Sequence, residues 1–264
     1  MMLFELERLT YRYEGVTAVD DLSIAIPEGS RIALLGANGS GKSTVLRLLD
    51  GLIFGQSGAT RFRGEALTED RLQDDAFNLS FRRTVGMIFQ NPDVQLFNPT
   101  VFDEVAFGPL QLRLPKDEIR DRVDAILDRL RIGHLKHRIP HRLSGGEKKR
   151  VALASVLVLD PAVLLLDEPT ASLDPRSQSE VIDLLVDWAG GAKSVITATH
   201  DLGDLEDIAD LCLVLDRGQV VAQGPPSEIL ADHALLQRTN LVHAHRHRDS
   251  GGHIRSHPHV HPEG

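Results

Sequence analysis

A glycine-rich segment, GANGSGKS at 36–43, has the residue types and spacing that bind phosphate groups. It fits the pattern G-x-x-x-x-G-K-[ST] and lies between an apolar stretch at 31–35, which predicts a buried strand, and helical apolar spacing from Ser43. Glycines let the backbone N–H groups turn toward phosphate oxygens, and the helix N-terminus adds a favourable field. We expect Lys42 to reach the β- and γ-phosphates of a nucleotide and Ser43 to ligate Mg²⁺. The residues expected to contact the nucleotide here are Gly36, Asn38, Gly39, Ser40, Gly41, Lys42, Ser43 and Thr44.

An acidic pair, Asp167 and Glu168, ends the apolar stretch VLLL at 163–166. A buried parallel strand presents its ligands at its carboxyl end, so both carboxylates are expected at the sheet edge that holds the phosphate loop. Asp167 suits the Mg²⁺ shell, and Glu168 suits the base that polarises an attacking water. Two solvated acids closing a strand are the alternative, and the phosphate loop upstream argues against it.

The segment LSGGE at 143–147 adds a second candidate anion site, because Ser144, Gly145 and Gly146 stand at the start of a predicted helix. Ser144 and Glu147 also have the spacing of a capping box, and both readings can hold together. With the phosphate loop and the acidic pair in the same order, the sequence from residue 3 to about 230 resembles the ATP-binding subunits of ABC transporters.

This resemblance implies an ATPase that works as a pair of subunits, most simply a homodimer, with ATP and Mg²⁺ as cofactors. LSGGE resembles the signature sequence that binds the γ-phosphate held by the opposite subunit. Gln90 resembles the glutamine that senses Mg²⁺ and the attacking water, and Asp174, in SLD at 172–174, resembles a residue of the loop that crosses the dimer interface. His200 resembles the histidine that contacts the γ-phosphate and positions the water with Glu168.

One aromatic side chain is expected against the adenine ring. Tyr13 precedes the phosphate loop and resembles the residue that stacks there, while Tyr11, two positions away on a predicted strand, is the competitor. Core packing is the alternative role for Tyr13.

The segments FQNPDVQLF at 89–97 and TVFDEVAFGP at 100–109 are similar to the ATPases of energy-coupling-factor importers, which carry vitamins or transition-metal ions. Such importers combine paired ATPases with a coupling membrane protein and a substrate-capture membrane protein. We therefore expect a membrane partner to dock near 90–109, on the cytoplasmic face of the membrane. The alternative is that Leu96, Phe97 and Phe102 pack inside a helical subdomain. Gln95 is characteristic of the family, without a role that the sequence reveals.

The C-terminal segment 243–264 is rich in histidine, Gly, Pro and Arg and predicts a disordered tail. Neutral imidazoles accept Co²⁺ and Ni²⁺ well, so the tail favours a metal importer, with Co²⁺ first and Ni²⁺ next, over a vitamin importer. Such a tail also binds nickel in vitro whether or not biology uses it. A metal-buffering protein would explain only the tail. A soluble ABC protein acting on ribosomes or DNA usually has two linked ATPase domains or a long coiled-coil insertion, whereas this sequence has one set of ATPase motifs and no such insertion. The tail histidines are His243, His245, His247, His253, His257, His259 and His261.

Alternating strands and helices elsewhere predict an α/β fold: a P-loop NTPase of the ABC type with a mainly parallel sheet. Residues 3–27 alternate apolar and polar positions around Glu14 and Gly15, which predicts an N-terminal antiparallel β lobe. An inserted α-helical subdomain is expected at about 91–160, inside an ATPase domain of residues 1–242. Further helices are expected at 116–130, 146–159, 175–188 and 202–209, and strands at 163–167, 194–199 and 211–216.

Composition is that of a globular protein, with 42% hydrophobic and 25% charged residues among 264 and a net charge of −9. This charge argues against a nucleic acid as the main partner. The single cysteine, Cys212, has no partner for an internal disulfide, and the acidic N-terminus is unlike a secretory signal, so we expect a cytoplasmic protein.

Overall fold

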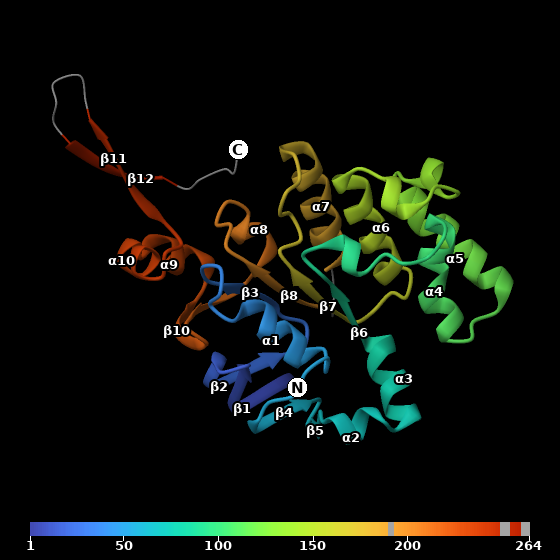
Figure 1. Ribbon diagram of the computed structural model, residues 1–264, viewed down its shortest axis with the longest axis horizontal. Coiled ribbons are helices and arrows are strands. Elements are labelled where there is room, and N and C mark those ends of the chain that lie inside the picture. Colours follow the sequence, from blue (N-terminus) through green and yellow to red (C-terminus); the bar gives the residue numbers. More distant parts are fainter. Residues whose placement is uncertain (190–192, 249–253, 260–264) are drawn as a thin grey trace.

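Two β-sheets, one antiparallel and one mainly parallel, form the framework of the molecule (Figure 1). The computed structural model describes residues 1–189, 193–248 and 254–259. His253 and His261, two of the predicted tail ligands, lie outside these residues.

The antiparallel sheet has four strands in the order β2-β1-β4-β5. It begins with a long hairpin whose turn is at Glu14 and Gly15, both with positive φ, as the alternating pattern predicts. Its strands are β1 (Met2–Tyr13), β2 (Val16–Pro27), β4 (Ser57–Phe62) and β5 (Glu65–Ala66).

The second sheet has six strands in the order β10-β9-β3-β8-β7-β6. The five strands from β9 to β6 run parallel, and β10 is antiparallel at one edge. The strands are β3 (Arg31–Leu35), β6 (Val85–Ile88), β7 (Val163–Asp167), β8 (Ser194–Thr199), β9 (Leu211–Asp216) and β10 (Gln219–Gly224). The predicted α/β fold, with a mainly parallel sheet and an antiparallel lobe, is therefore confirmed.

Helices pack against this framework (Figure 1). The α-helices are α1 (Lys42–Leu49), α2 (Glu69–Leu72), α3 (Asp75–Thr84), α4 (Val101–Gln111), α5 (Lys116–Arg129), α6 (Gly145–Leu157), α7 (Pro175–Trp188), α8 (Leu205–Ile208), α9 (Pro226–Ala231) and α10 (His233–Arg238). Short 3₁₀ turns are η1 (Pro92–Val94), η2 (Gly133–Leu135) and η3 (Pro140–Arg142). No helix among the described residues has the length and apolar character that a membrane crossing requires. The domain bounds 1–242 and 91–160 stay predictions.

The six-stranded sheet is buried on both faces. Along β7, Val163 and Leu165 belong to the core shared with α1 and the antiparallel sheet, while Leu164 and Leu166 belong to the core formed with α4–α7. A third cluster, which includes fully buried Cys212 of β9, lies against α8–α10. Continuous apolar strands result, because a parallel sheet covered on both faces has no solvated side.

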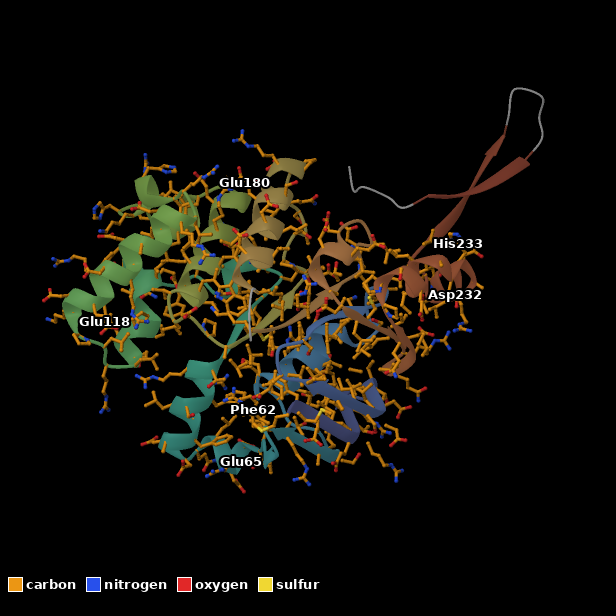
Figure 2. All side chains as sticks on the ribbon, turned by 180° about the vertical axis from the view of Figure 1, so that it is seen from behind. Phe62, Glu65, Glu118, Glu180, Asp232 and His233 are labelled. Atoms are coloured by element: carbon orange, nitrogen blue, oxygen red, sulfur yellow. The ribbon has the colours of Figure 1, made fainter. Side chains whose placement is uncertain are left out.

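Aromatic packing fixes the antiparallel lobe against α3. Phe62 of β4 lies with its ring centroid 5.2 Å from that of Phe4 and 5.0 Å from that of Phe81. In Figure 2, Phe62 lies inward from Glu65, which is exposed at the rim of the same lobe. Helix α3, for which the sequence analysis makes no prediction, packs Phe81 against this lobe.

Asp50, at the C-terminus of α1, carries a buried carboxyl group. Its Oδ2 lies 3.1 Å from Nη1 of Arg82 in α3, and burial raises the pKa of Asp50 to about 7 despite this partner. Between about pH 4 and pH 7 the folded state therefore binds more protons at this site than the unfolded state, so the free energy of unfolding falls as pH rises through that window.

Replacement of Asp50 by Asn is expected to remove this pH dependence. The stability of Asp50→Asn relative to the wild type should increase by about 2 kcal/mol between about pH 5 and about pH 8, because the amide cannot ionise. Urea unfolding of both proteins at the two pH values measures the difference. Equal pH slopes in the two proteins would contradict the assignment.

The boundaries of several predicted helices differ from the structure. A helix expected at 202–209 is confined to α8, because the Asp201 side chain accepts a hydrogen bond from the Gly203 N–H and forms a turn there. The helix expected at 146–159 begins one residue earlier and ends at Leu157, and α5 ends at Arg129. The helix at 175–188 and the strands at 163–167, 194–199 and 211–216 are confirmed.

The segment beyond residue 242, where the composition predicts disorder, contains two paired strands, β11 (His243–Arg248) and β12 (Ile254–His259) (Figure 1). Their antiparallel register sets His243 opposite His259 and His245 opposite His257. Histidine at every second position is the periodicity of a strand, which composition alone does not register.

Candidate active site

The carboxyl ends of neighbouring parallel strands bring the predicted site residues together. The phosphate loop follows β3, the acidic pair ends β7, and His200 follows β8, which lies between these two strands. Gln90 comes two residues after β6, at the edge of the same sheet. This edge is where open α/β sheets bind ligands.

The phosphate loop needs glycine at two crowded positions. A Cβ on Gly36 would lie 2.4 Å from the Leu215 carbonyl oxygen, and one on Gly41 would lie 2.4 Å from the Ala18 carbonyl oxygen. Both glycines have positive φ. Asn38 and Gly39 are exposed at the tip of the loop, whereas Ser40 and Thr44 are buried.

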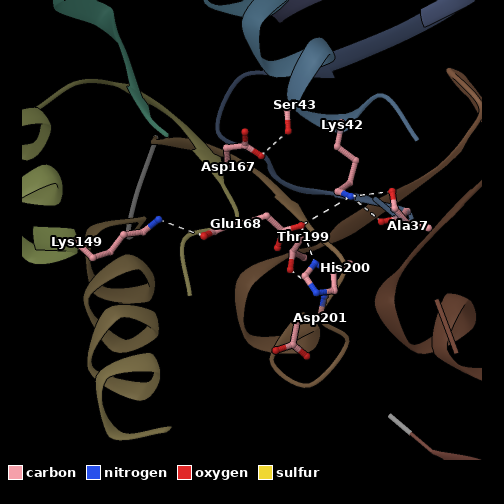
Figure 3. A network of polar contacts seen from close by, with 10 residues as sticks. Ala37, Lys42, Ser43, Lys149, Asp167, Glu168, Thr199, His200 and Asp201 are labelled. Atoms are coloured by element: carbon pink, nitrogen blue, oxygen red, sulfur yellow. Dashed lines mark hydrogen bonds and ion pairs between the residues drawn. The ribbon is translucent and has the colours of Figure 1, made fainter. Parts of the chain in front are cut away.

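Lys42 lies inside this loop, with its ammonium group 2.6 Å from the Gly36 carbonyl oxygen and 3.2 Å from that of Ala37 (Figure 3). Its Nζ is also 3.8 Å from Oε1 of Glu168. Burial lowers the pKa of Lys42, and the nearby Glu168 and Asp167 oppose that shift. A buried cation at a helix N-terminus is suited to an anionic ligand.

Two features fit a nucleotide with its metal ion. The Ser40 hydroxyl oxygen is buried and has no hydrogen-bond partner within the part of the chain that the structure describes. Ser43 donates a hydrogen bond to Oδ1 of Asp167 at 2.9 Å, which sets a hydroxyl beside a carboxylate, the oxygen ligands that Mg²⁺ prefers. Burial raises the pKa of Asp167, and the hydrogen bond from Ser43 counteracts this.

Glu168 and His200 form the second polar contact of the site. Nδ1 of His200 lies 2.9 Å from Oε1 of Glu168, and the Glu168 side chain is only 6% exposed (Figure 3). The Glu168 backbone has φ 46°, in the left-handed region, and its N–H donates to the Ala198 carbonyl oxygen at 2.9 Å. Such a conformation in a non-glycine residue costs about 1 kcal/mol or more and is common at active sites.

The structure distinguishes the two tyrosines. Tyr11 packs on the core, whereas Tyr13 is 37% exposed and its hydroxyl oxygen accepts a hydrogen bond from Arg47 of α1 at 3.4 Å. The two rings meet edge to face with centroids 4.7 Å apart. Tyr13 is therefore the tyrosine available to a ligand beside α1.

Ser144, Gly145, Gly146 and Asp174 lie at the starts of α6 and α7. Ser144 and Glu147 form the predicted capping box, and Asp174 caps α7 by accepting from the Ser177 N–H. The hydrogen bond from the Ser177 hydroxyl, and then that from its N–H, lowers the pKa of Asp174. Within the described residues, no hydrogen bond or ion pair connects these four residues to Lys42 or Glu168. Ser144 and Gly145 are exposed at the start of α6.

The structure contains hydrogen bonds near the site that the sequence analysis does not predict. Gln90 has an exposed side chain, and its backbone carbonyl oxygen accepts a hydrogen bond from the ammonium group of buried Lys149. Gln95, unassigned from sequence, donates to the Ala152 carbonyl oxygen and to Ser155 of α6. The run KKR at 148–150 predicts that the side chain of Lys149 is exposed to solvent. The apolar stretch that follows this run is the one sequence signal for a buried helix face.

Sequence comparisons identify relatives across most of the chain. Residues 19–171 match the ABC transporter family. The chain is 54% identical to the nickel import ATP-binding protein NikO of Rhodobacter capsulatus, over 90% of this chain and 95% of that protein. It is 39% identical to the energy-coupling factor transporter ATP-binding protein EcfA of Methanothermobacter thermautotrophicus, over 90% of this chain and 76% of that protein.

Solved structures of ABC transporter ATP-binding proteins have a similar fold. The cbiO1 protein of Clostridium perfringens, part of the ABC transporter complex cbiONQ, has a TM-score of 0.75 at 39% identity and covers 91% of this chain and 95% of its own. The ATP-binding cassette MJ0796, solved as a dimer in a post-hydrolysis state with ADP and Pi, has a TM-score of 0.76 at 25% identity, over 85% of this chain and 99% of its own. With its phosphate loop, acidic pair and histidine at one sheet edge, the chain belongs to the ATP-binding proteins of ABC transporters, which hydrolyse ATP to drive transport.

Proposed function

We propose that this chain is the ATPase subunit of an energy-coupling-factor importer that carries Ni²⁺ or Co²⁺. The observation that carries the catalytic part is the buried Glu168 carboxylate, 2.9 Å from His200 and 3.8 Å from Lys42. The sequence alone ranks Co²⁺ first, and the similarity to a nickel import protein favours Ni²⁺.

Nucleotide binding is assigned to the phosphate loop and the residues around it. Lys42 exchanges its contacts with the Gly36 and Ala37 carbonyl oxygens for phosphate oxygens, and Tyr13 stacks on the adenine ring. Ser43, Asp167 and Gln90 are the residues that would hold Mg²⁺. The metal ion, when bound, neutralises charge on the phosphate oxygens.

Hydrolysis is assigned to Glu168 and His200. Glu168 accepts a proton from the attacking water as general base, and His200, in contact with the same carboxylate, holds that water and the γ-phosphate in line. Gln90, which follows the edge strand β6, helps to orient the attacking water. Low exposure of Glu168 strengthens these electrostatic effects, because little solvent screens them.

A second ATPase subunit completes each site. Ser144, Gly145 and Gly146 stand at the start of α6, where Ser144 and Gly145 are exposed. This helix N-terminus is therefore assigned to the γ-phosphate bound by the other copy. Asp174 lies in the loop assigned to the same interface. A homodimer is the simplest pairing, and a related cassette has been solved as a dimer.

An exposed apolar surface near η1 and α4 is assigned to the membrane coupling protein. Val94 is 68%, Phe97 62% and Phe107 38% exposed, and the Phe97 and Phe107 rings meet edge to face at 5.0 Å. Leu96 instead is buried, and Phe102 packs on the core beneath Lys136. The subunit therefore sits peripherally on the cytoplasmic face, with a substrate-capture membrane protein in the same complex.

The histidine-rich tail is assigned to binding of the transported ion. The register of β11 and β12, which pairs His243 with His259 and His245 with His257, supports this assignment. Neutral imidazoles on opposite strands suit Ni²⁺ and Co²⁺.

Uptake of radioactive Ni²⁺ and Co²⁺ tests the function as a whole. Cells expressing the chain with its membrane partners should accumulate one of the two ions, and Glu168→Gln should abolish this accumulation. Deletion of 243–264 should leave ATP hydrolysis intact and reduce uptake at limiting metal. Absence of uptake of either ion, with all subunits verified in the membrane, would contradict the cargo assignment and favour a vitamin importer.

A further inference from the structure

Lys149 of α6 is a buried cation that contacts the backbone of two proposed catalytic residues, Gln90 and Glu168. The residue is 2% exposed, and its ammonium group donates to the carbonyl oxygens of Phe89 at 3.3 Å, Gln90 at 3.1 Å and Glu168 at 3.2 Å (Figure 3). A lysine ammonium has three protons, so each one has an acceptor. Burying a cation is costly unless such hydrogen bonds compensate, and an apolar side chain would fill the same space without that cost.

The bond to Glu168 acts on a strained peptide. With φ at 46°, the Glu168 backbone needs support from both sides: its N–H is held by Ala198 of β8 and its carbonyl oxygen by Lys149. The direction of the carboxylate toward His200 depends on this backbone conformation.

The hydrogen bonds from Lys149 to Phe89 and Gln90 connect the loop after β6 to helix α6. Gln95 reinforces this link: its Nε2 donates to Ala152 and Ser155 of α6 at 3.0 and 3.1 Å, and its Oε1 accepts from the Phe89 N–H at 3.4 Å. The segment that carries Gln90 is thus fastened to α6 by Lys149 and by Gln95, and the N-cap of α6 is Ser144.

We propose that Lys149 is a positioning residue, which fastens the loops that carry Gln90 and Glu168 to the helix that begins with the signature segment. A displacement of α6 by a nucleotide on the opposite subunit is then transmitted to the base and to Gln90 together. This inference rests on the proposed catalytic role of Glu168. No hydrogen bond among the described residues links Lys149 to the phosphate loop, so its loss should affect turnover rather than ATP affinity.

Steady-state hydrolysis by the full-length chain tests this directly. Lys149→Met is expected to lower kcat by about 10- to 100-fold, the size of effect that a displacement of about 1 Å has on catalysis, with KM for ATP changed by less than about threefold. Lys149→Arg, which keeps charge and donors, should recover part of kcat. Lys116→Met is the matched control, because Lys116 is exposed at the start of α5 and its loss should have little effect.

A double-mutant cycle separates positioning from a general structural role. If Lys149 acts through Glu168, the double variant Lys149→Met with Glu168→Gln should hydrolyse ATP no more slowly than Glu168→Gln alone. Losses that multiply in the double variant, or a Lys149→Met enzyme with unchanged kcat, would overturn the proposal. Normal turnover by Glu168→Gln would instead overturn the assignment of the base, and the inference with it. Should Lys149→Met not fold, Lys149→Gln enters the cycle under the same criteria.

Discussion

Glu168→Gln is expected to reduce kcat for ATP hydrolysis by about 10²- to 10⁴-fold, the contribution typical of a positioned general base. The amide has nearly the shape of the carboxylate, so the contact with His200 can persist while the proton acceptor is lost. Lys42 keeps its bonds to the Gly36 and Ala37 carbonyl oxygens in the variant, so ATP binding should be retained. Binding without hydrolysis should trap two copies around ATP.

Two measurements check this expectation. Hydrolysis assays give kcat, and size-exclusion chromatography with ATP should detect a stable dimer of the variant but not of the wild type. Glu206→Gln, which neutralises an exposed carboxylate on α8, is the matched control and should behave as the wild type. A monomeric Glu168→Gln protein with normal turnover would contradict the role of Glu168.

Lys42→Ala is expected to weaken ATP binding by about 10- to 100-fold and to abolish measurable hydrolysis. The estimate corresponds to the loss of hydrogen bonds to charged groups, worth about 1.5–3 kcal/mol. The buried ammonium group also lies 3.8 Å from Glu168 and interacts with Asp167, so its removal leaves less positive charge beside both carboxylates.

Isothermal titration calorimetry with ATP measures the affinity, and the ATP-induced rise in Tm gives an independent value through linkage. Lys136→Ala, which removes a lysine paired with Asp124 far along the chain, is the control. An unchanged Kd for Lys42→Ala, with the same ATP-induced rise in Tm as the wild type, would show that Lys42 is not a phosphate ligand.

The motifs at 36–43 and 163–168 were predictable because each is continuous in sequence and adjoins a run of at least four apolar residues. Their proximity followed from the rule that ligands gather at the carboxyl ends of parallel strands. Lys149 was not predictable in the same way, because the burial of a cation depends on three acceptors from segments distant in sequence. The α8 boundary was missed for a local reason: the Asp201 turn replaces the first helical residues despite helical apolar spacing.

Cys212 has a practical consequence for experiments on domain closure. It is fully buried in β9, and burial raises the pKa of its thiol to about 12, so it stays protonated and shielded at neutral pH. The wild-type chain therefore already provides a background without a reactive thiol. A cysteine introduced at an exposed position such as Ser172, in the loop before α7, can be labelled selectively with a maleimide dye and used to follow the approach of two subunits by fluorescence.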